Sequence, residues 1–235
     1  MKRYTRRKSY KARTMLILLF IMLICVMISK IVLNSEFRFP SFRSVTHHVA
    51  NEDYGWNLIL VNRDNYIPDD YKLELTELSN GRKVDSRIYP ELQEMFDDAR
   101  AQGYGLFVRE GYRTQEEQQQ ILDEKIEAYE NEGNSKSKAR KLAEEWVAIP
   151  GTSEHQLGIA VDINADTAKS SRDEVYNWLA ENAYRYGFIK RYPSDKTDIT
   201  GVFNEPWHYR YVGKEAAQEI YSQGICLEEY IEAIQ

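Results

Sequence analysis

The segment PGTSEHQLGIAVDIN, residues 150–164, decides the fold because a turn rich in polar residues leads directly into an apolar strand. In a strand, alternate side chains face opposite sides of a sheet, so Asp162 lies on the face away from the aliphatic residues of GIAVDI. An acid there is costly to bury without a cation or hydrogen-bond donors. Gly158 lets the chain turn so that His155 can approach Asp162. This pair alone indicates either part of a metal site or a hydrogen-bonded His–Asp pair at a capped turn.

A second segment, NEPWHYRYVG at 204–213, supplies what a metal site would still need. His208 begins a predicted strand, and with His155 and Asp162 it would make three ligands. Three protein ligands leave the fourth position of a tetrahedral zinc ion for water, as in catalytic zinc sites. Bound zinc lowers the pKa of that water to roughly 7. Glu205, three residues before His208, fits a base that does not bind the metal, although its spacing also suits a surface carboxylate.

The charge distribution separates the N-terminus from the rest of the chain. Residues 1–33 contain eight of the 31 Lys and Arg residues and no acid, which leaves 23 basic and 37 acidic residues, a balance of −14, in the remainder. An acidic body of this kind argues against a nucleic-acid groove. We therefore expect no nucleic-acid partner.

The apolar run at 14–33 is about twenty residues long, enough to span a bilayer. Lys30, near its far end, can extend to the membrane interface. No small-x-small cleavage site follows, and Ile24 precedes Cys25 where a lipoprotein needs a small residue. We therefore favour an uncleaved single-pass signal anchor over a cleaved signal peptide.

The predicted organisation has four parts. Residues 1–13 form a basic cytoplasmic N-terminus, 14–33 the transmembrane anchor, 34–52 a stalk and 53–235 the catalytic domain. The localisation that follows is the cell membrane, with the catalytic domain extracytoplasmic.

Within the domain, helix and strand patterns alternate irregularly, which favours an α+β fold with a mainly antiparallel sheet flanked by helices. Helix signals are Pro90 with Gly103, two capping boxes that begin at Thr114 and Ser171, and a C-terminal pair separated by Gly224. The predicted strands are 56–62, 104–112 and 207–213, together with the strand that carries Asp162.

The two polar segments resemble a known family. SEHQLGIAVD matches the pattern S-x-H-x-x-G-x-A-x-D, and EPWHYRYVG matches E-x-W-H, of VanY-type D-alanyl-D-alanine carboxypeptidases. These are zinc peptidases related to the hedgehog fold. LILVNRDNYIPDDY, REGYRTQEEQ and YGFIKRYPSDKTDITG also look like family segments in family order, so the likeness covers roughly residues 55–224.

The resemblance implies one zinc ion held by His155, Asp162 and His208, with Glu205 as general base. Arg113, in GYRT, matches an arginine that contacts the substrate carbonyl or terminal carboxylate, a role suited to a planar charged donor. Gln118 and Ser153 match positions that help to hold the C-terminal residue of the substrate. Ser153 could instead cap a turn, and Gln118 could be an exposed helix residue. Tyr192, in KRYP, is interpreted as a residue lining the cleft.

The function implied is removal of the terminal D-alanine from peptidoglycan stem peptides, which lie outside the membrane. An L,D-carboxypeptidase acting on tetrapeptides shares these motifs and stays open as an alternative. A wall-binding domain that keeps zinc for structure is the alternative from another class, and Glu205 argues against it because a binding module needs no base. A D,D-carboxypeptidase would also deprive glycopeptide antibiotics such as vancomycin of their D-Ala-D-Ala target, so a resistance role is expected.

Overall fold

The structure is a computed structural model, and it describes residues 48–49 and 54–235. The predicted cytoplasmic segment 1–13, the anchor 14–33 and most of the stalk 34–52 lie outside the described residues. Among the residues that are described, no helix is both long and apolar enough to cross a membrane. The described residues group as one compact unit.

A four-stranded antiparallel sheet lies at the centre, in the order β5-β6-β8-β7. The strands are β5 (Leu106–Glu110), β6 (Ala160–Ala165), β7 (Phe188–Lys190) and β8 (His208–Tyr211). The predicted antiparallel sheet is therefore confirmed. Its register places Asp162 of β6 opposite His208 of β8 on one side and opposite Glu110 of β5 on the other.

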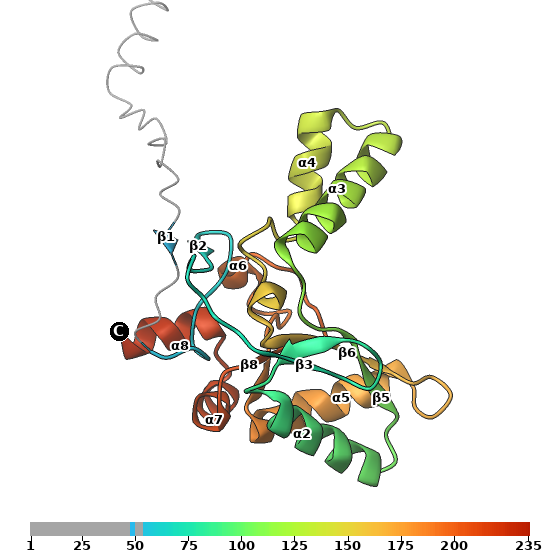
Figure 1. The fold of residues 1–235 in the computed structure, drawn as a ribbon, viewed down its shortest axis with the longest axis vertical. Helices are drawn as coiled ribbons and strands as arrows, with labels where there is room; N and C mark the ends of the chain where they lie inside the picture. The colour runs from blue at the N-terminus through green and yellow to red at the C-terminus, as the bar shows by residue number, and fades with distance from the viewer. Residues whose placement is uncertain (1–47, 50–53) are drawn as a thin grey trace, which may run out of the picture. The chain divides into compact units, whose positions relative to one another are not determined.

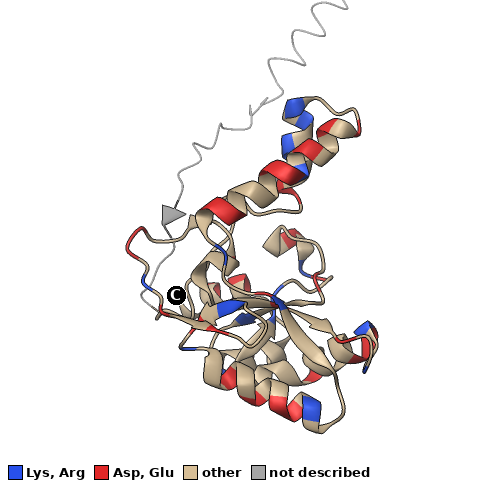
Figure 2. Ribbon diagram, turned by 45° about the vertical axis from the view of Figure 1, so that its right-hand side comes forward, with Lys and Arg blue, Asp and Glu red and all other residues tan. Residues whose placement is uncertain are grey.

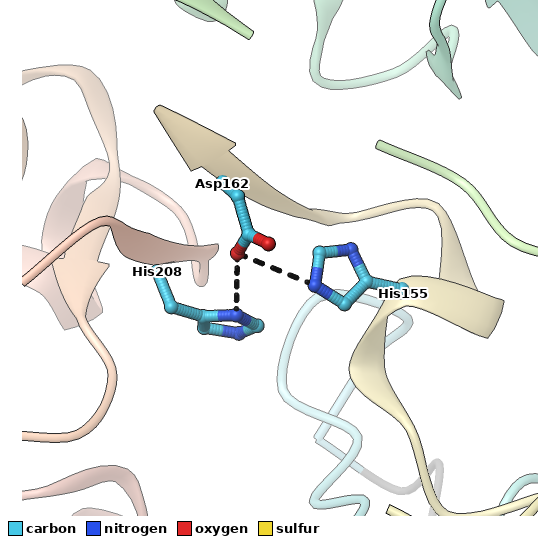
Figure 3. A group of neighbouring side chains, drawn as sticks. All are labelled: His155, Asp162 and His208. Atoms are coloured by element: carbon cyan, nitrogen blue, oxygen red, sulfur yellow. Dashed lines mark hydrogen bonds and ion pairs between the residues drawn. The ribbon is translucent and has the colours of Figure 1, made fainter. Parts of the chain in front are cut away.

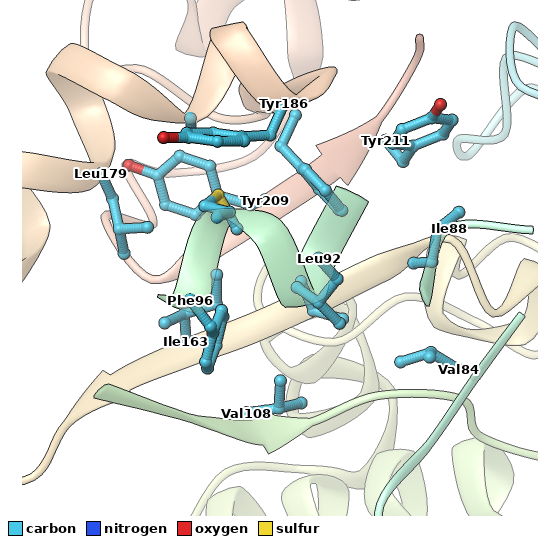
Figure 4. Close-up of a cluster of buried hydrophobic side chains, with 14 of the residues drawn as sticks. Val84, Ile88, Leu92, Phe96, Val108, Ile163, Leu179, Tyr186, Tyr209 and Tyr211 are labelled. Atoms are coloured by element: carbon cyan, nitrogen blue, oxygen red, sulfur yellow. The ribbon is translucent and has the colours of Figure 1, made fainter. Parts of the chain in front are cut away.

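Helices cover one face of this sheet (Figure 1). They are α2 (Tyr89–Ala101) and α5 (Arg172–Asn182), the latter followed by a 3-10 turn, η2 (Ala183–Tyr186). The aliphatic face of β6 packs towards them, as its alternating pattern predicts. Figure 4 shows this core, in which side chains from strands and helices interdigitate; labelled members include Val84, Ile88, Leu92, Phe96, Val108, Ile163, Leu179, Tyr186, Tyr209 and Tyr211. The opposite face of β6 is left for Asp162.

A second apolar cluster is built around the C-terminal helices α7 (Lys214–Gln223) and α8 (Leu227–Ile234). As predicted, Gly224 separates them, in a left-handed conformation with φ 64°. Cys226, the N-cap of α8, is buried. The cluster reaches the sheet at Ile189, the residue of β7 that points away from the first core.

The helices α3 (Gln115–Asn131) and α4 (Lys136–Glu144) form an antiparallel pair that projects from the body of the domain (Figure 1). The predicted capping box is present: Thr114 accepts a hydrogen bond from the backbone of Glu117, and the Glu117 side chain bonds back to Thr114. Acidic residues are frequent on α3 and basic residues on α4 (Figure 2). The capping box fixes the start of α3 directly after Arg113.

The remaining elements are short. They are β1 (His48–Val49), β2 (Asn65–Tyr66), β3 (Leu75–Glu77), β4 (Lys83–Asp85), the 3-10 turn η1 (Glu154–Leu157) and α6 (Thr197–Thr200). β1 lies within the range predicted as stalk and pairs in parallel with β2. β3 and β4 form an antiparallel pair.

The predicted first strand at 56–62 is wrong. Residues 56–58 form a turn and a bend, and Ile59 and Val61 are fully buried. The segment pairs with no described strand and makes only one isolated bridge, from Asn62. Two of its backbone carbonyls, those of Asn57 and Ile59, accept hydrogen bonds from the buried guanidinium of Arg210 and not from a neighbouring strand. An apolar run of this length shows burial, and sequence alone does not reveal what its backbone bonds to.

Candidate metal centre and active-site cleft

Three metal-binding side chains meet on the face of the sheet opposite α2 and α5. His155 comes from η1, Asp162 from β6 and His208 from β8, and one ligand atom of each lies within 4.8 Å of the other two. The Asp162 carboxylate lies between both imidazoles (Figure 3), with Oδ1 at 3.4 Å from Nε2 of His155 and 3.0 Å from Nδ1 of His208. The structure thus brings together the three residues that the sequence predicts.

Local backbone geometry places His155. The chain leaves η1 through Gly158, whose φ of 71° is left-handed, and any Cβ there would press on the backbone of Asp85. Nδ1 of His155 donates a hydrogen bond to the carbonyl of Gly111 at 2.8 Å, which leaves Nε2 unprotonated and facing Asp162. Burial lowers the pKa of His155, although Asp162 opposes this. A neutral imidazole with one nitrogen so fixed is suited to bind a metal.

His208 is held at both nitrogens. Nδ1 lies 3.0 Å from Asp162, and Nε2 lies 3.3 Å from an oxygen of Glu154. Burial alone would lower the pKa of His208, but the two carboxylates outweigh it and raise the pKa to about 9. Because a metal ligand must be deprotonated, a divalent ion at Nδ1 would replace a proton there.

The donor set fits zinc. Two imidazole nitrogens and one carboxylate oxygen are ligands that zinc uses, and three protein ligands leave one position open. Asp162 is ionised, because both histidines lower its pKa against the opposing effect of burial. The three groups therefore offer one negative charge and two nitrogen donors to a single ion.

Glu205 lies beside this cluster and outside the set of three converging ligands. Its Oε2 is 3.8 Å from Nδ1 of His208, and its side chain is 22% exposed. Burial raises the pKa of Glu205, with a smaller contribution from Asp162 that also raises it and an opposing one from His208. A carboxylate with a raised pKa next to a metal site is suited to accept and return a proton.

Arg113 enters the same cleft from the connection between β5 and α3. Its Nη2 lies 3.7 Å from Asp162, and its Nη1 donates to the side-chain oxygen of Gln118 at 3.3 Å. Its backbone N–H donates to the carbonyl of His155. Nε is buried and has no hydrogen-bond partner among the described residues, with Glu110 3.8 Å away. The guanidinium is thus fixed in place with donor capacity left.

Gln118, Ser153 and Tyr192 all line the cleft. Gln118 is buried and donates to the carbonyl of Ala148 at 2.7 Å, so the interpretation of it as an exposed helix residue is wrong. Ser153 is buried and its side chain does not cap η1. The half-buried ring of Tyr192 has its centroid 5.0 Å from that of His208. Whether these three contact substrate stays a prediction.

The cleft has a volume of about 220 Å³. It is lined by the three candidate ligands, Glu205, Arg113 and residues from α3, α4 and the loop before β8. Trp146, just after α4, and Phe203, in the loop before β8, are exposed aromatic residues with ring centroids 5.0 Å apart, and Trp146 is part of the lining. A small molecule or the end of a peptide can therefore reach the candidate metal ligands.

Comparison with known proteins agrees with this geometry. The family model VanY, described as D-alanyl-D-alanine carboxypeptidase, matches residues 81–214, which is more than half of the chain. The chain belongs to the VanY family. A D-alanyl-D-alanine carboxypeptidase of Enterococcus faecalis is 61% identical over 180 residues, which are 77% of this chain and 67% of that relative.

Two solved structures of VanY proteins are close in fold. VanYB in complex with D-alanine-D-alanine is 61% identical, with a TM-score of 0.75 over 77% of this chain and 99% of that one. A zinc complex of the vancomycin-resistance D,D-pentapeptidase VanY from a VanB-type resistance cassette is 62% identical, with a TM-score of 0.72 over 75% of this chain and 99% of that one. Residues 81–214, which the family model matches, include every residue of the candidate site from Arg113 to His208.

Four charged residues behind the site were not predicted from the sequence: the buried Glu154, Arg191 and Arg210, and the half-buried Glu228. Glu154 occupies the variable position of S-x-H in the VanY motif, and Arg191 lies in KRYP, where only Tyr192 was assigned a role. In the structure Glu154 and Arg191 are only 2% and 1% exposed, and they form an ion pair at 2.7 Å. No periodicity distinguishes a buried ion pair from two surface charges, so this signal was absent from the sequence.

Proposed function

We propose that this chain is a membrane-anchored zinc D,D-carboxypeptidase that removes the C-terminal D-alanine from peptidoglycan stem peptides. The observation that carries the proposal is the meeting of three metal ligands, a carboxylate with a raised pKa and a fixed arginine in one cleft. It is supported by 61% identity to VanYB, which was solved with D-alanine-D-alanine.

His155, Asp162 and His208 would hold one zinc ion. The zinc complex of the related VanY pentapeptidase supports this choice of metal. When bound, zinc acts as a Lewis acid and lowers the pKa of a coordinated water. The hydrogen bond from His155 to the Gly111 carbonyl and that between His208 and Glu154 fix which nitrogen of each ring faces the ion.

Glu205 would move the proton. Its half-buried carboxylate lies close enough to the ligand cluster to take a proton from the attacking water and pass it to the leaving amine. The raised pKa of Glu205 brings its proton affinity nearer to that needed at neutral pH. Asp162, whose pKa is lowered, cannot share this task.

Arg113 would bind the substrate carboxylate or the oxyanion of the scissile carbonyl. Its side chain is held by Gln118 and Asp162, so little rotamer entropy is lost when substrate binds. Gln118 would therefore act partly through Arg113. Ser153 and Tyr192 would complete the pocket for the terminal residue, since both line the cleft beside the ligands.

The proposed topology places segment 1–13 in the cytoplasm and the apolar run 14–33 across the membrane. The stalk 34–52 would then present the domain 53–235 to the cell wall, where stem peptides ending in D-alanine are found. Removal of that D-alanine would lower the number of D-Ala-D-Ala ends to which vancomycin binds, which gives the chain a role in glycopeptide resistance. Protease treatment of intact protoplasts should degrade the domain; protection would place it inside.

The decisive experiment incubates the zinc-loaded chain with a pentapeptide ending in D-Ala-D-Ala and, separately, with the tetrapeptide ending in a single D-alanine. Mass spectrometry then detects released D-alanine. We expect release from the pentapeptide. Release from the tetrapeptide only would favour an L,D-carboxypeptidase, and release from neither would favour a wall-binding domain.

A further inference from the structure

We propose that the C-terminal helix α8 fixes the metal-binding form of His208 through a buried chain of contacts, Glu228–Arg191–Glu154. Glu228 lies outside residues 81–214, the part of the chain that the family model matches. The inference rests on the proposed zinc centre, because it explains how one of its ligands is oriented. Each link in the chain is a short contact between groups that are buried or, at Glu228, half-buried.

The first link joins Glu154 to His208. The carboxylate of Glu154 is 2% exposed, and its Oε2 lies 3.3 Å from Nε2 of His208. An ionised carboxylate only accepts hydrogen bonds, so Nε2 must carry the proton. Nδ1, which faces Asp162, is then the nitrogen left for a metal ion. Glu154 thereby selects the tautomer of a ligand without touching the ion itself.

The second link joins Glu154 to Arg191. Nε of Arg191 donates to Oε1 of Glu154 at 2.7 Å, which leaves the other oxygen of that carboxylate free to face His208. The backbone N–H of Arg191 also donates to the carbonyl of His208 at 3.2 Å. Arg191 follows directly after β7, so the edge strand of the sheet holds both the carboxylate and the histidine backbone.

The third link reaches α8. Nη1 and Nη2 of Arg191 donate to the two oxygens of Glu228 at 2.8 and 2.6 Å, a bidentate pair that fixes the plane of the guanidinium. Glu228 lies in the first turn of α8, whose N-terminus favours a negative charge. The helix is in turn anchored by Leu227, Tyr230 and Ile231 in the second apolar cluster.

The charges of this network balance. Arg210, fully buried, places Nη1 at 3.1 Å from Oε1 of Glu154, so two carboxylates face two guanidinium groups. Burial of such a set is costly, and removal of one member leaves an uncompensated charge. A pair of apolar residues would pack in the same space but would give His208 no acceptor. The network therefore makes physical sense as a device for orientation, with α8 as its outer support.

The test compares zinc binding in variants of the full-length chain in mild detergent. Glu154→Gln keeps an oxygen that can accept from Nε2 of His208, whereas Glu154→Met removes it at similar volume. We expect zinc affinity, measured by chelator competition, to fall about 100-fold in Glu154→Met and at most about 10-fold in Glu154→Gln. Equal loss in both variants, or none in Glu154→Met, would overturn the orienting role, since a role in packing alone predicts no rescue by glutamine.

The contribution of α8 is tested with Glu228→Gln, which weakens the pair with Arg191. Its matched control is Glu232→Gln, an exposed position on the same helix. We expect about 10-fold weaker zinc binding for Glu228→Gln and no change for Glu232→Gln. If both variants bind zinc as tightly as the unmodified chain, α8 has no part in orienting the ligand.

Nitrogen-15 NMR of histidine-labelled protein gives an independent readout, because the chain contains only four histidines. With zinc bound, His208 should show a protonated Nε2 and a metal-bound Nδ1. Metal at Nε2 would overturn the inference while leaving His208 a ligand. If no His208 signal responds to zinc, the ligand assignment itself fails, and the proposed orientation fails with it.

Discussion

Asp162 and Glu205 are two carboxylates in one cleft whose surroundings shift their pKa values in opposite directions. Both are raised by burial, but at Asp162 the two histidines outweigh burial and the net shift is downward. At Glu205 burial prevails and the pKa is raised. Surroundings that shift the pKa values of two neighbouring acids in opposite directions usually give the two acids different catalytic roles. Asp162 is suited to stay charged as a ligand, and Glu205 to exchange a proton.

Glu205→Ala should therefore retain zinc and lose turnover. Because the carboxylate is not one of the three converging ligands, zinc stoichiometry should stay at one ion per chain. Loss of a general base lowers kcat by about 10²–10⁴-fold. Steady-state kinetics on the pentapeptide, with metal content measured on the same sample, checks both expectations. Activity within a few-fold of the unmodified chain would remove Glu205 from the mechanism.

Arg113→Lys tests whether the guanidinium binds the substrate carboxylate or oxyanion. Lysine keeps the charge but lacks the planar set of donors that Gln118 and Asp162 hold in place. We expect kcat/KM to fall about 10- to 100-fold, the equivalent of one charge-assisted hydrogen bond of about 1.5–3 kcal/mol. Arg109→Lys, at an exposed position of β5, is the control and should change nothing. Similar effects in both variants would argue against a specific role.

Sequence patterns predicted the residues of the site far better than the groups that support them. His155, Asp162 and His208 stand in two motifs, and the structure places their side chains together. Glu154 stands in the same motif at a position that accepts any residue type, and its partner Arg191 is 37 residues away. A hydrogen bond between remote groups leaves no periodic signal, so these supporting residues required the three-dimensional structure.

At the scale of elements, the N-terminal cap of α3 controls where Arg113 lies. Thr114→Ala removes the oxygen that caps this helix, and Ser171→Ala does the same for α5, which lies on the far side of the sheet. Each variant should lose about 1 kcal/mol of unfolding free energy, measured by urea titration. The Thr114 variant alone should also raise KM for the pentapeptide, because Arg113 immediately precedes the cap. An equal rise of KM in both variants would disconnect the cap from the site.

Three of the four strands of the central sheet, β5, β6 and β8, could be predicted from sequence, whereas β7 and the pairing of the strands could not. The alternation in β6 correctly separated Asp162 from the aliphatic face, and both capping boxes formed as expected. The register that places His208 opposite Asp162 depends on contacts between strands more than 40 residues apart in sequence. The segment 56–62 shows the same limit, since two of its carbonyls, those of Asn57 and Ile59, accept hydrogen bonds from Arg210 instead of from a neighbouring strand.

At the scale of the whole domain, β7 connects the two apolar clusters. Its alternation points Phe188 into the core under α2 and α5, and Ile189 into the cluster of α7 and α8. Arg191, the first residue after β7, carries this connection to the site through Glu154. The candidate metal centre is therefore supported by both clusters, which couples zinc binding to the stability of the whole domain.

Removal of zinc should accordingly lower the melting temperature of the domain. A ligand present at 100 times its Kd stabilises the folded state by about 2.7 kcal/mol. For a domain of 150–250 residues, each kcal/mol corresponds to about 2–4 °C, so a chelator should lower the Tm by about 5–10 °C. His208→Ala, left with two of the three ligands, should melt at the same temperature with and without chelator. Calorimetry of both proteins checks this, and an equal chelator effect in the variant would place the stabilising ion elsewhere in the chain.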